Sequence, residues 1–210
     1  MIFRTRFAPS PTGPLHLGHA FSALTAWDQS RAENGAFLLR IEDIDQSRAR
    51  PEWEQQIYDD LTWLGLWWPT PVLRQSDQLD RYRTTLEYLW ARDLIYPCTC
   101  SRRDIQTAAN APQEGAEPTI GPDGIVYPGT CRVTQSSFTP DPLPADALRL
   151  NMRAALAEIL PAPLAFNEGN KTITIDPSEA IENVGDIVLS RRDMGTSYHL
   201  SVVLDDASQN

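Results

Sequence analysis

Along the first half of the chain, short apolar runs alternate with apolar stripes at helical spacing. Residues 2–8 form a run typical of a strand, which ends at a sharp break of proline, serine and glycine in residues 9–14. A helix is predicted from about Leu17, because apolar side chains recur there every three or four residues, at Ala20, Phe21, Leu24 and Trp27. Asn34-Gly35 is its stop signal, and residues 36–41 predict a buried strand. Strand, helix and strand in this order predict a βαβ unit with a parallel sheet.

Two further helices follow this unit. Pro51 suits the first turn of a helix that ends at Gly65, and a third helix is predicted over residues 77–92. The six tryptophans lie mostly in or beside these helices. We expect them to pack in the core, because large aromatic side chains dominate buried area.

The composition changes at Tyr96-Pro97. From there to about Pro144 the chain is rich in proline, glycine, threonine and alanine, which indicates an inserted module rather than a continuing sheet. Beyond it, the pattern predicts a helix over 145–160, a strand over 171–175 and a strand over 186–190 that returns to the core.

Composition and charge limit the classes of function that this chain can have. The chain is 41% hydrophobic and 22% charged, which is ordinary for a soluble globular protein, and no apolar run approaches the roughly 20 residues of a membrane span. We therefore expect a cytoplasmic protein with no membrane partner. The net charge of -10 argues against unspecific adhesion to nucleic acid, but a local basic face is enough for an RNA partner. Candidates for such a face are Arg81, Arg83, Arg92, Arg102, Arg103 and Arg132; scattered, solvated arginines explain the same pattern equally well.

The turn from the first strand into the first helix carries candidate chemistry. A helix start leaves N–H groups unpaired, which together with the helix dipole attract phosphate. His16 and His19 can donate hydrogen bonds to phosphate oxygens, and Gly18 permits close approach. The alternatives are a metal pair, which lacks a third ligand nearby, and two histidines that cap a helix.

Three acids, Glu42, Asp43 and Asp45, follow the second strand, at the edge where parallel sheets bind ligands. A carboxylate here can hold the ammonium group of an amino acid, and the guanidinium of Arg6 matches a carboxylate. A magnesium site and a solvated acidic loop are the alternatives.

The chain has three cysteines, Cys98, Cys100 and Cys131, too few for a disulfide scaffold. Tetrahedral zinc needs a fourth ligand, and the three histidines lie in other candidate sites, so another oxygen or nitrogen donor must complete the set. Zinc would explain how an insertion with little core holds its shape. Three unliganded thiols are the alternative.

Three segments resemble a known family. Residues 6–20, RFAPSPTGPLHLGHA, closely resemble the signature of glutamyl-tRNA synthetases, with residues 16–19 standing as their HIGH motif. Residues 39–45, LRIEDID, and 198–206, YHLSVVLDD, resemble two further segments of that family. The form RIEDID, the run CTCSR at 98–102, Tyr127 four residues before Cys131, and RRD at 191–193 are more similar to the shorter glutamyl-queuosine tRNA(Asp) synthetases.

The resemblance implies an α/β fold, a class I synthetase Rossmann-like parallel sheet with an inserted zinc-binding module. It implies three parts: residues 1–94 as the first half of the catalytic domain, 95–183 as the zinc-binding or acceptor-type module, and 184–210 as the start of the second half. The implied catalytic and ATP-binding residues are His16, Gly18 and His19. The implied glutamate-binding residues are Arg6, Ala8, Ser10, Glu42 and Tyr198. The implied zinc ligands are Cys98, Cys100, Tyr127 and Cys131.

The implied function is ATP-dependent activation of glutamate, with Mg²⁺ accompanying ATP, and transfer to the queuosine base of tRNA(Asp); we expect a monomer. The family continues beyond Asp206 into an arginine segment and a lysine loop, and neither occurs before Asn210, so we expect a C-terminally truncated chain with a reduced rate. Met194 and a longer cysteine insertion are smaller departures. The alternatives are a catalytic fragment of a conventional glutamyl-tRNA synthetase and a non-catalytic protein that binds nucleotide or RNA.

Overall fold

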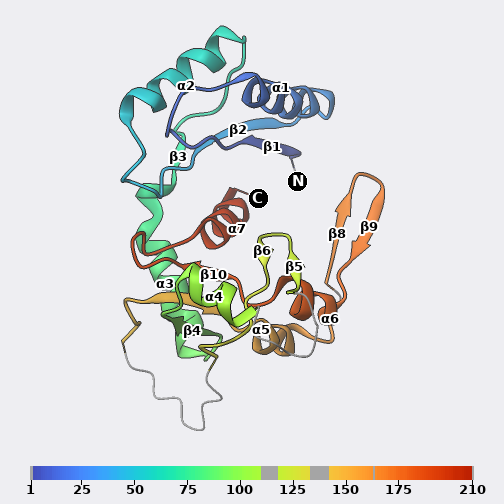
Figure 1. Cartoon of the computed structure of the whole chain (residues 1–210). Helices are drawn as coiled ribbons and strands as arrows, with labels where there is room; N and C mark the ends of the chain where they lie inside the picture. Colours follow the sequence, from blue (N-terminus) through green and yellow to red (C-terminus); the bar gives the residue numbers. More distant parts are fainter. Residues whose placement is uncertain (1, 110–117, 133–141, 163, 210) are drawn as a thin grey trace. The chain divides into compact units, whose positions relative to one another are not determined.

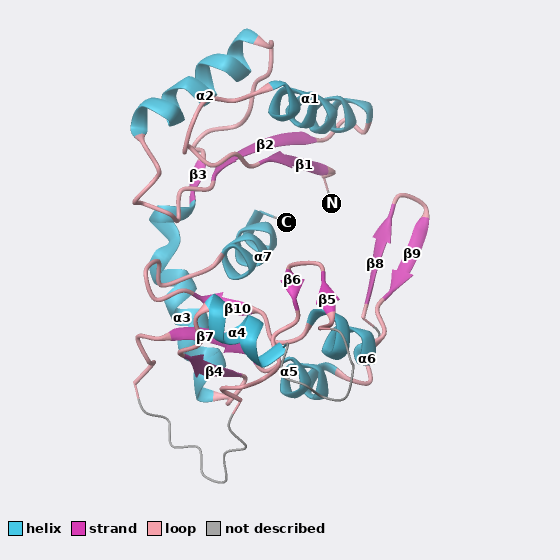
Figure 2. Ribbon diagram, in the orientation of Figure 1, coloured by secondary structure: helices cyan, strands magenta, loops and turns pink. Residues whose placement is uncertain are grey.

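Two units make up the chain, and each has a sheet of its own (Figures 1 and 2). The computed structural model describes residues 2–109, 118–132, 142–162 and 164–209. The first unit comprises Met1–Tyr82 and Leu200–Asn210, and the second comprises Arg83–His199. The three-part division expected from the sequence has other boundaries and stays a prediction. Within the predicted insertion, residues 110–117 and 133–141 lie outside the described part of the chain.

The first unit is built on a parallel sheet with the strand order β1-β2-β3. Phe7 pairs with Leu39 across the first two strands. Its elements are β1 (Arg4–Phe7), α1 (Leu17–Ala32), β2 (Ala36–Ile41), α2 (Pro51–Trp63), β3 (Leu73–Arg74), the 3-10 turn η1 (Gln75–Gln78), the start of α3 (Leu79–Ala91) and most of α7 (Tyr198–Gln209). The predicted βαβ unit and the predicted second strand are therefore confirmed.

The two faces of this sheet differ in chemistry because side chains alternate along a strand. One face carries buried apolar side chains that pack with those of α1 and α2, namely Phe7, Ala23, Phe37, Leu39, Ile41, Ile57, Leu61 and Leu66. Figure 1 shows these two helices on the same side of the sheet. The alternate positions Arg6 and Arg40 form ion pairs with Asp206 of α7. The sheet thus has an apolar side and an ionic side.

Helix α1 packs most of the predicted stripe against the sheet: Leu24 and Trp27 contact the buried cluster, and Phe21 is the exception. Phe21 is 72% exposed, whereas Ala23 is completely buried, because a small side chain lets the helix approach the sheet closely. The helix ends as predicted at residues 34–35, where Asn34 takes a positive φ of 50°. The expectation of core tryptophans is wrong for Trp63 and Trp67, which are 85% and 63% exposed.

The second unit contains an antiparallel sheet in the order β10-β7-β4 and two hairpins. Its elements include the end of α3, β4 (Ile95–Cys98), α4 (Arg102–Ala109), β5 (Ile120–Gly121), β6 (Gly124–Ile125), β7 (Ala147–Leu150), α5 (Met152–Ile159), β8 (Ala165–Glu168), β9 (Lys171–Thr174), α6 (Pro177–Glu179), the π-helical turn η2 (Ala180–Val184) and β10 (Val188–Ser190). None of the described helices in either unit is long and apolar enough to cross a bilayer.

The structure corrects one predicted element of the second unit and completes another. The segment 145–160 was predicted to be one helix, but its first part is the central strand β7, and the helix begins only at Met152. Asn151 caps that helix, since its side chain accepts a hydrogen bond from the amide of Ala154 at 3.2 Å. The strand predicted over 171–175 is confirmed as β9, and its hairpin partner β8 was not predicted.

Candidate functional site

The two histidines of the HIGH-like motif cap helix α1. His16 is the N-cap residue, and its Nδ1 accepts a hydrogen bond from the amide of Gly18 at 3.1 Å. Nδ1 of His19 accepts a hydrogen bond from the amide of His16 at 3.2 Å, and the two rings stack with centroids 3.8 Å apart. A Cβ atom at Gly18 would lie only 3.0 Å from the His16 ring. A side chain here would therefore push the His16 ring away from the helix start by a few tenths of an ångström, which glycine avoids.

This capping fixes which imidazole atoms face a ligand. A neutral imidazole that accepts at Nδ1 carries its proton on Nε2, so both rings offer an N–H donor on the side away from the helix. Burial, with a smaller contribution from the charge of His16, lowers the pKa of His19. The amides of Gly18 and His19 already have acceptors within the turn. The two imidazoles are thus side-chain donors that this turn presents.

Four of the predicted ligand-binding residues line one cavity of the first unit. Its volume is about 430 Å³, and its walls include Arg6, Ala8, Ser10 and His19. The guanidinium of Arg6 is held by α7, since Nε donates to the side chain of Gln209 at 3.1 Å and Nη2 donates to the carbonyl of Asp206 at 3.3 Å. Nη1 of Arg6 has no partner among the described residues, and it is available for a carboxylate.

Glu42 lies next to this cavity and belongs to an ionic cluster. Its amide donates to the carbonyl of Pro9, a cavity residue, at 3.0 Å. Its carboxylate accepts a hydrogen bond from Nη2 of Arg40 at 2.9 Å, and Nη1 of Arg40 binds Asp206 at 2.5 Å. Burial raises the pKa of Glu42, and Arg40 opposes that shift. Arg40 therefore holds the Glu42 carboxylate in place and favours its charged form.

The other two acids of the segment have local partners. Asp43 is buried and accepts hydrogen bonds from the amide and the hydroxyl of Ser76, at 2.8 and 2.6 Å, which fixes the start of η1. Asp45 accepts a hydrogen bond from the hydroxyl of Ser47 at 2.6 Å. Of the three acids, Glu42 is the one placed beside the cavity.

Tyr198, the remaining predicted glutamate-binding residue, belongs to the second unit. It is the first residue of α7, is 58% exposed, and its ring lies 6.0 Å from that of His199. Its role in glutamate binding stays a prediction.

The three cysteines gather in the second unit around Tyr127. Their sulfur atoms all lie within 4.8 Å of one another, and those of Cys100 and Cys131 are 3.3 Å apart. The hydroxyl oxygen of Tyr127 lies 3.5 Å from the sulfur of Cys98 and 3.6 Å from that of Cys100. A hydrogen bond from Tyr127 lowers the pKa of the Cys131 thiol to about 6, so that thiol ionises readily at neutral pH.

This donor set fits zinc. Ligands at about 2.3 Å for sulfur and about 2.0 Å for oxygen, placed at tetrahedral angles, lie about 3.8 Å apart for two sulfurs and about 3.5 Å apart for sulfur and oxygen. The cysteine and tyrosine distances are close to these values. Nε of the buried Arg149 donates to the sulfur of Cys98 at 3.3 Å, and its guanidinium lies 3.8 Å from the centre of the Tyr127 ring. This positive charge offsets the negative charge of several thiolates.

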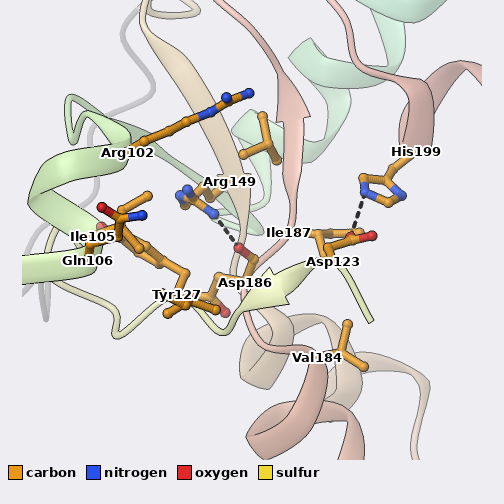
Figure 3. A pocket seen from close by; sticks show the side chains of 12 residues that line it. Arg102, Ile105, Gln106, Asp123, Tyr127, Arg149, Val184, Asp186, Ile187 and His199 are labelled. Atoms are coloured by element: carbon orange, nitrogen blue, oxygen red, sulfur yellow. Dashed lines mark hydrogen bonds and ion pairs between the residues drawn. The ribbon is translucent and has the colours of Figure 1, made fainter. Parts of the chain in front are cut away.

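A second cavity, of about 450 Å³, lies in the second unit (Figure 3). Arg149 and Tyr127 lie in its wall, so it shares residues with the cysteine cluster. Asp186, which is 2% exposed, also lines it and accepts hydrogen bonds from Tyr96 at 2.5 Å and from Arg132 at 2.7 Å. On another side of the cavity, His199 lies 3.0 Å from the carboxylate of Asp123. The sequence did not indicate this cavity.

Comparison with known proteins decides the family. The family described as tRNA synthetases class I (E and Q), catalytic domain, matches residues 2–120. A glutamyl-Q tRNA(Asp) synthetase from Rhodobacter capsulatus is 60% identical over 98% of this chain and 73% of its own length. The chain belongs to the class I tRNA synthetases of the glutamyl and glutaminyl type. The fold class and the resemblance inferred from the sequence are therefore confirmed.

More distant members of this synthetase family also match most of the chain. A glutamyl-Q tRNA(Asp) synthetase from Rhodopirellula baltica is 37% identical over 96% of this chain, and the chain spans 60% of that protein. A crystal structure of a glutamate tRNA ligase from Elizabethkingia meningosepticum in complex with its amino acid matches the whole chain with a TM-score of 0.70 and 25% identity, and the chain covers 42% of it. This chain is thus shorter than the synthetases that it matches.

Sequence reasoning missed the residues that hold the site together. Arg40 is a charge inside the apolar run 36–41, and an arginine that is 3% exposed needs buried partners. The position of an arginine inside an apolar run was the sequence signal from which its structural role could have been predicted. The sequence around Asp205 and Arg149 contains no comparable signal, because their partners are distant in sequence. Asp205 binds Gln75 and Tyr82, and Arg149 binds Cys98.

Proposed function

We propose that this synthetase-family chain activates glutamate with ATP and passes the glutamyl group to the queuosine base of tRNA(Asp). The observation that carries the proposal is the cavity of the first unit, which the guanidinium of Arg6 and the imidazole of His19 both line and whose residue Pro9 is hydrogen-bonded to the backbone of Glu42. The glutamyl-Q relatives support the acceptor.

Activation requires positioning rather than a protein nucleophile. The α-carboxylate of glutamate attacks the α-phosphorus of ATP in line, forms the mixed anhydride glutamyl-adenylate, and releases pyrophosphate. The Nε2–H groups of His16 and His19 donate to phosphate oxygens as negative charge builds on them, and Gly18 keeps His16 in that position. Mg²⁺ accompanying ATP supplies further positive charge to the phosphates.

The amino acid is oriented by opposite charges. Glu42, held by Arg40, binds the ammonium group, and Nη1 of Arg6 binds a carboxylate. Ala8 and Ser10 complete the wall, and the family resemblance implies that Tyr198 also takes part in glutamate binding. Because burial raises the pKa of Glu42, its protonation as the pH falls weakens glutamate binding.

We also propose that Cys98, Cys100, Tyr127 and Cys131 hold one structural zinc ion. The support is the fit of their distances to a tetrahedral site and the basic side chain of Arg149 beside it. The cytoplasmic location, the monomeric state and the three-part division at 1–94, 95–183 and 184–210 remain predictions alongside it.

Binding of a stable analogue, glutamyl-sulfamoyl-adenosine, tests the activation site by calorimetry. We expect Glu42→Gln to weaken binding at least about tenfold, because the ammonium loses its counter-charge. Arg83→Gln is the control, since Arg83 pairs with Glu87 on an exposed helix face. The proposal fails when the glutaminyl analogue binds as tightly as the glutamyl analogue, or when Glu42→Gln binds like the wild type. Transfer of labelled glutamate to tRNA(Asp) with and without queuosine then tests the acceptor.

A further inference from the structure

The second-unit cavity is built around a fixed guanidinium. Arg149, which is 9% exposed, lies against the ring of Tyr127 on one face. Along its edge, Nε donates to the sulfur of Cys98 at 3.3 Å and Nη1 donates to the carbonyl of Asp186 at 2.7 Å. These contacts fix the planar group in the wall of the cavity, and Figure 3 shows its hydrogen bond to Asp186. A guanidinium held in this way is a stacking surface for a flat ring.

The remaining walls suit a flat heterocycle with polar edges. Ile105 of α4, Ile125 of β6 and Ile187 supply apolar surface from three different segments, and the volume of about 450 Å³ is in the range of small-ligand sites. Gln106 of α4, which lines the same cavity, has no hydrogen-bond partner among the described residues, so its amide can both donate to and accept from a ligand.

The cavity also has an unpaired positive charge. Of the six arginines considered for a basic face, four are paired with an acid: Arg81, Arg83, Arg92 and Arg132. Arg102 and Arg103 of α4 have no partner within the described part of the chain. Only Arg102 of these two lines the cavity, and Figure 3 shows its side chain extended there. A protein with a net charge of -10 needs such a local charge to bind a phosphate backbone.

We propose that this cavity binds one unstacked base of a single-stranded RNA loop, with the base on the Arg149 plane and a backbone phosphate at Arg102. The proposal rests on the proposed function, which requires an RNA acceptor. It adds a base-binding site in the second unit, separate from the ATP and glutamate residues of the first unit.

Binding of a fluorescently labelled RNA hairpin with a single-stranded loop tests the proposal. We expect Ile125→Trp, which fills the cavity, to weaken binding at least about tenfold, and Arg102→Gln to weaken it about fivefold. Arg103→Gln removes the same charge from the same helix outside the cavity and should change binding less than about twofold. Zinc content and circular dichroism of each variant check that it folds.

Four results overturn the base-binding proposal. Equal losses for Arg102→Gln and Arg103→Gln mean diffuse attraction to RNA. Equal binding of a loopless RNA duplex means that no base enters the cavity. Loss of free-glutamate binding in Arg102→Gln means that the cavity is an amino-acid site. Absence of hairpin binding by the wild type also counts against it.

The analogue glutamyl-sulfamoyl-adenosine, measured in the same variants, separates the two proposals. Hairpin binding that depends on Ile125 and Arg102 without analogue binding rejects glutamate activation and keeps the base site. Analogue binding with an unchanged hairpin affinity in Ile125→Trp keeps activation and rejects the base site.

Discussion

Each unit contains one buried aspartate with arginine and tyrosine partners. In the first unit, Asp205 is completely buried and accepts hydrogen bonds from Gln75 and Tyr82, both at 2.9 Å. It also forms an ion pair with Arg81. In the second unit, Asp186 accepts from the hydroxyl of Tyr96 at 2.5 Å, from Arg132 at 2.7 Å and from the amide of Met152 at 2.9 Å. The two centres use the same chemistry.

Their surroundings differ. The first unit has a continuous apolar cluster between its sheet and two helices, including Phe37, Ile57 and Leu61. Around Tyr127 in the second unit, the buried cluster comprises only Tyr96, Cys98 and Tyr127 itself among the described residues, with two further cysteines packed against it. The first unit is thus stabilised mainly by apolar burial, and this part of the second by directed polar contacts and its proposed zinc.

Removal of zinc tests this comparison most strongly. We expect Cys98→Ser with Cys131→Ser, or a chelator, to abolish bound zinc and to remove hydrogen-exchange protection from β7, because zinc binding supplies folding free energy. Protection of β2 should persist. Mass spectrometry measures both quantities, and Thr99→Ala, between two of the cysteines, is the control. Loss of protection in both units together would contradict the comparison, as would a zinc-free wild type.

The two buried aspartates give the next largest effect. Asp186→Ala and Asp205→Ala each leave the hydrogen-bond donors around the carboxylate without an acceptor, among them the hydroxyl of Tyr96 or of Tyr82, at a typical cost of about 1–3 kcal/mol for each buried donor. We expect Asp186→Ala to be the more damaging locally, because fewer apolar contacts remain around Tyr96. Hydrogen exchange of β7 for the first variant and of β2 for the second measures the loss. The comparison is wrong when Asp205→Ala deprotects its strand more than Asp186→Ala does.

The predictable and unpredictable parts of the chain follow the same division. The sequence predicted β1, β2, α1 and α2 of the first unit, because apolar runs such as 36–41 and a proline at position 51 report local structure directly, but it did not predict β3 or α7. It misread the segment 145–160 as one helix, although Asn151, a residue typical of helix N-caps, separates the residues of β7 from those of α5. Pairing with β4 and β10 decides that the preceding residues form a strand.

The candidate site shows the same limit. The motif residues at 6–10, 16–19 and 42 were found because their order along the chain is distinctive, and the cavity of the first unit contains several of them. The partners that fix them were not found. Arg40 contacts Asp206, which lies 166 positions away, and such pairings depend on tertiary structure alone.

The variant Leu61→Ala tests the contribution of the apolar cluster to the stability of the first unit. Leu61 is completely buried in the first unit's cluster, and truncation of such a leucine costs roughly 2–5 kcal/mol. We expect β2 to lose hydrogen-exchange protection while zinc content and β7 stay unchanged. The control is Val203→Ala, because Val203 is 66% exposed and its loss should change stability by less than about 0.5 kcal/mol. A drop in zinc content for Leu61→Ala would show that the units do not respond separately.

The smallest effect concerns the histidine cap of α1 and depends on pH. The pKa of His19 lies below the ordinary 6.5, so the unfolded chain takes up a proton at a higher pH than the folded chain does. The stabilising contribution of His19 is therefore complete above about pH 6.5 and decreases as the pH falls through that value. The structural reason is that a protonated Nδ1 of His19 can no longer accept a hydrogen bond from the amide of His16.

Between about pH 7.5 and about pH 5.5, we expect the difference in Tm between wild type and His19→Ala to shrink by roughly 1–2 °C, as for partial loss of a helix cap. Thermal melts at several pH values measure it. A constant difference across that range would mean that His19 does not cap the helix through a neutral ring, and the assignment of its Nε2–H as a phosphate donor would lose its basis.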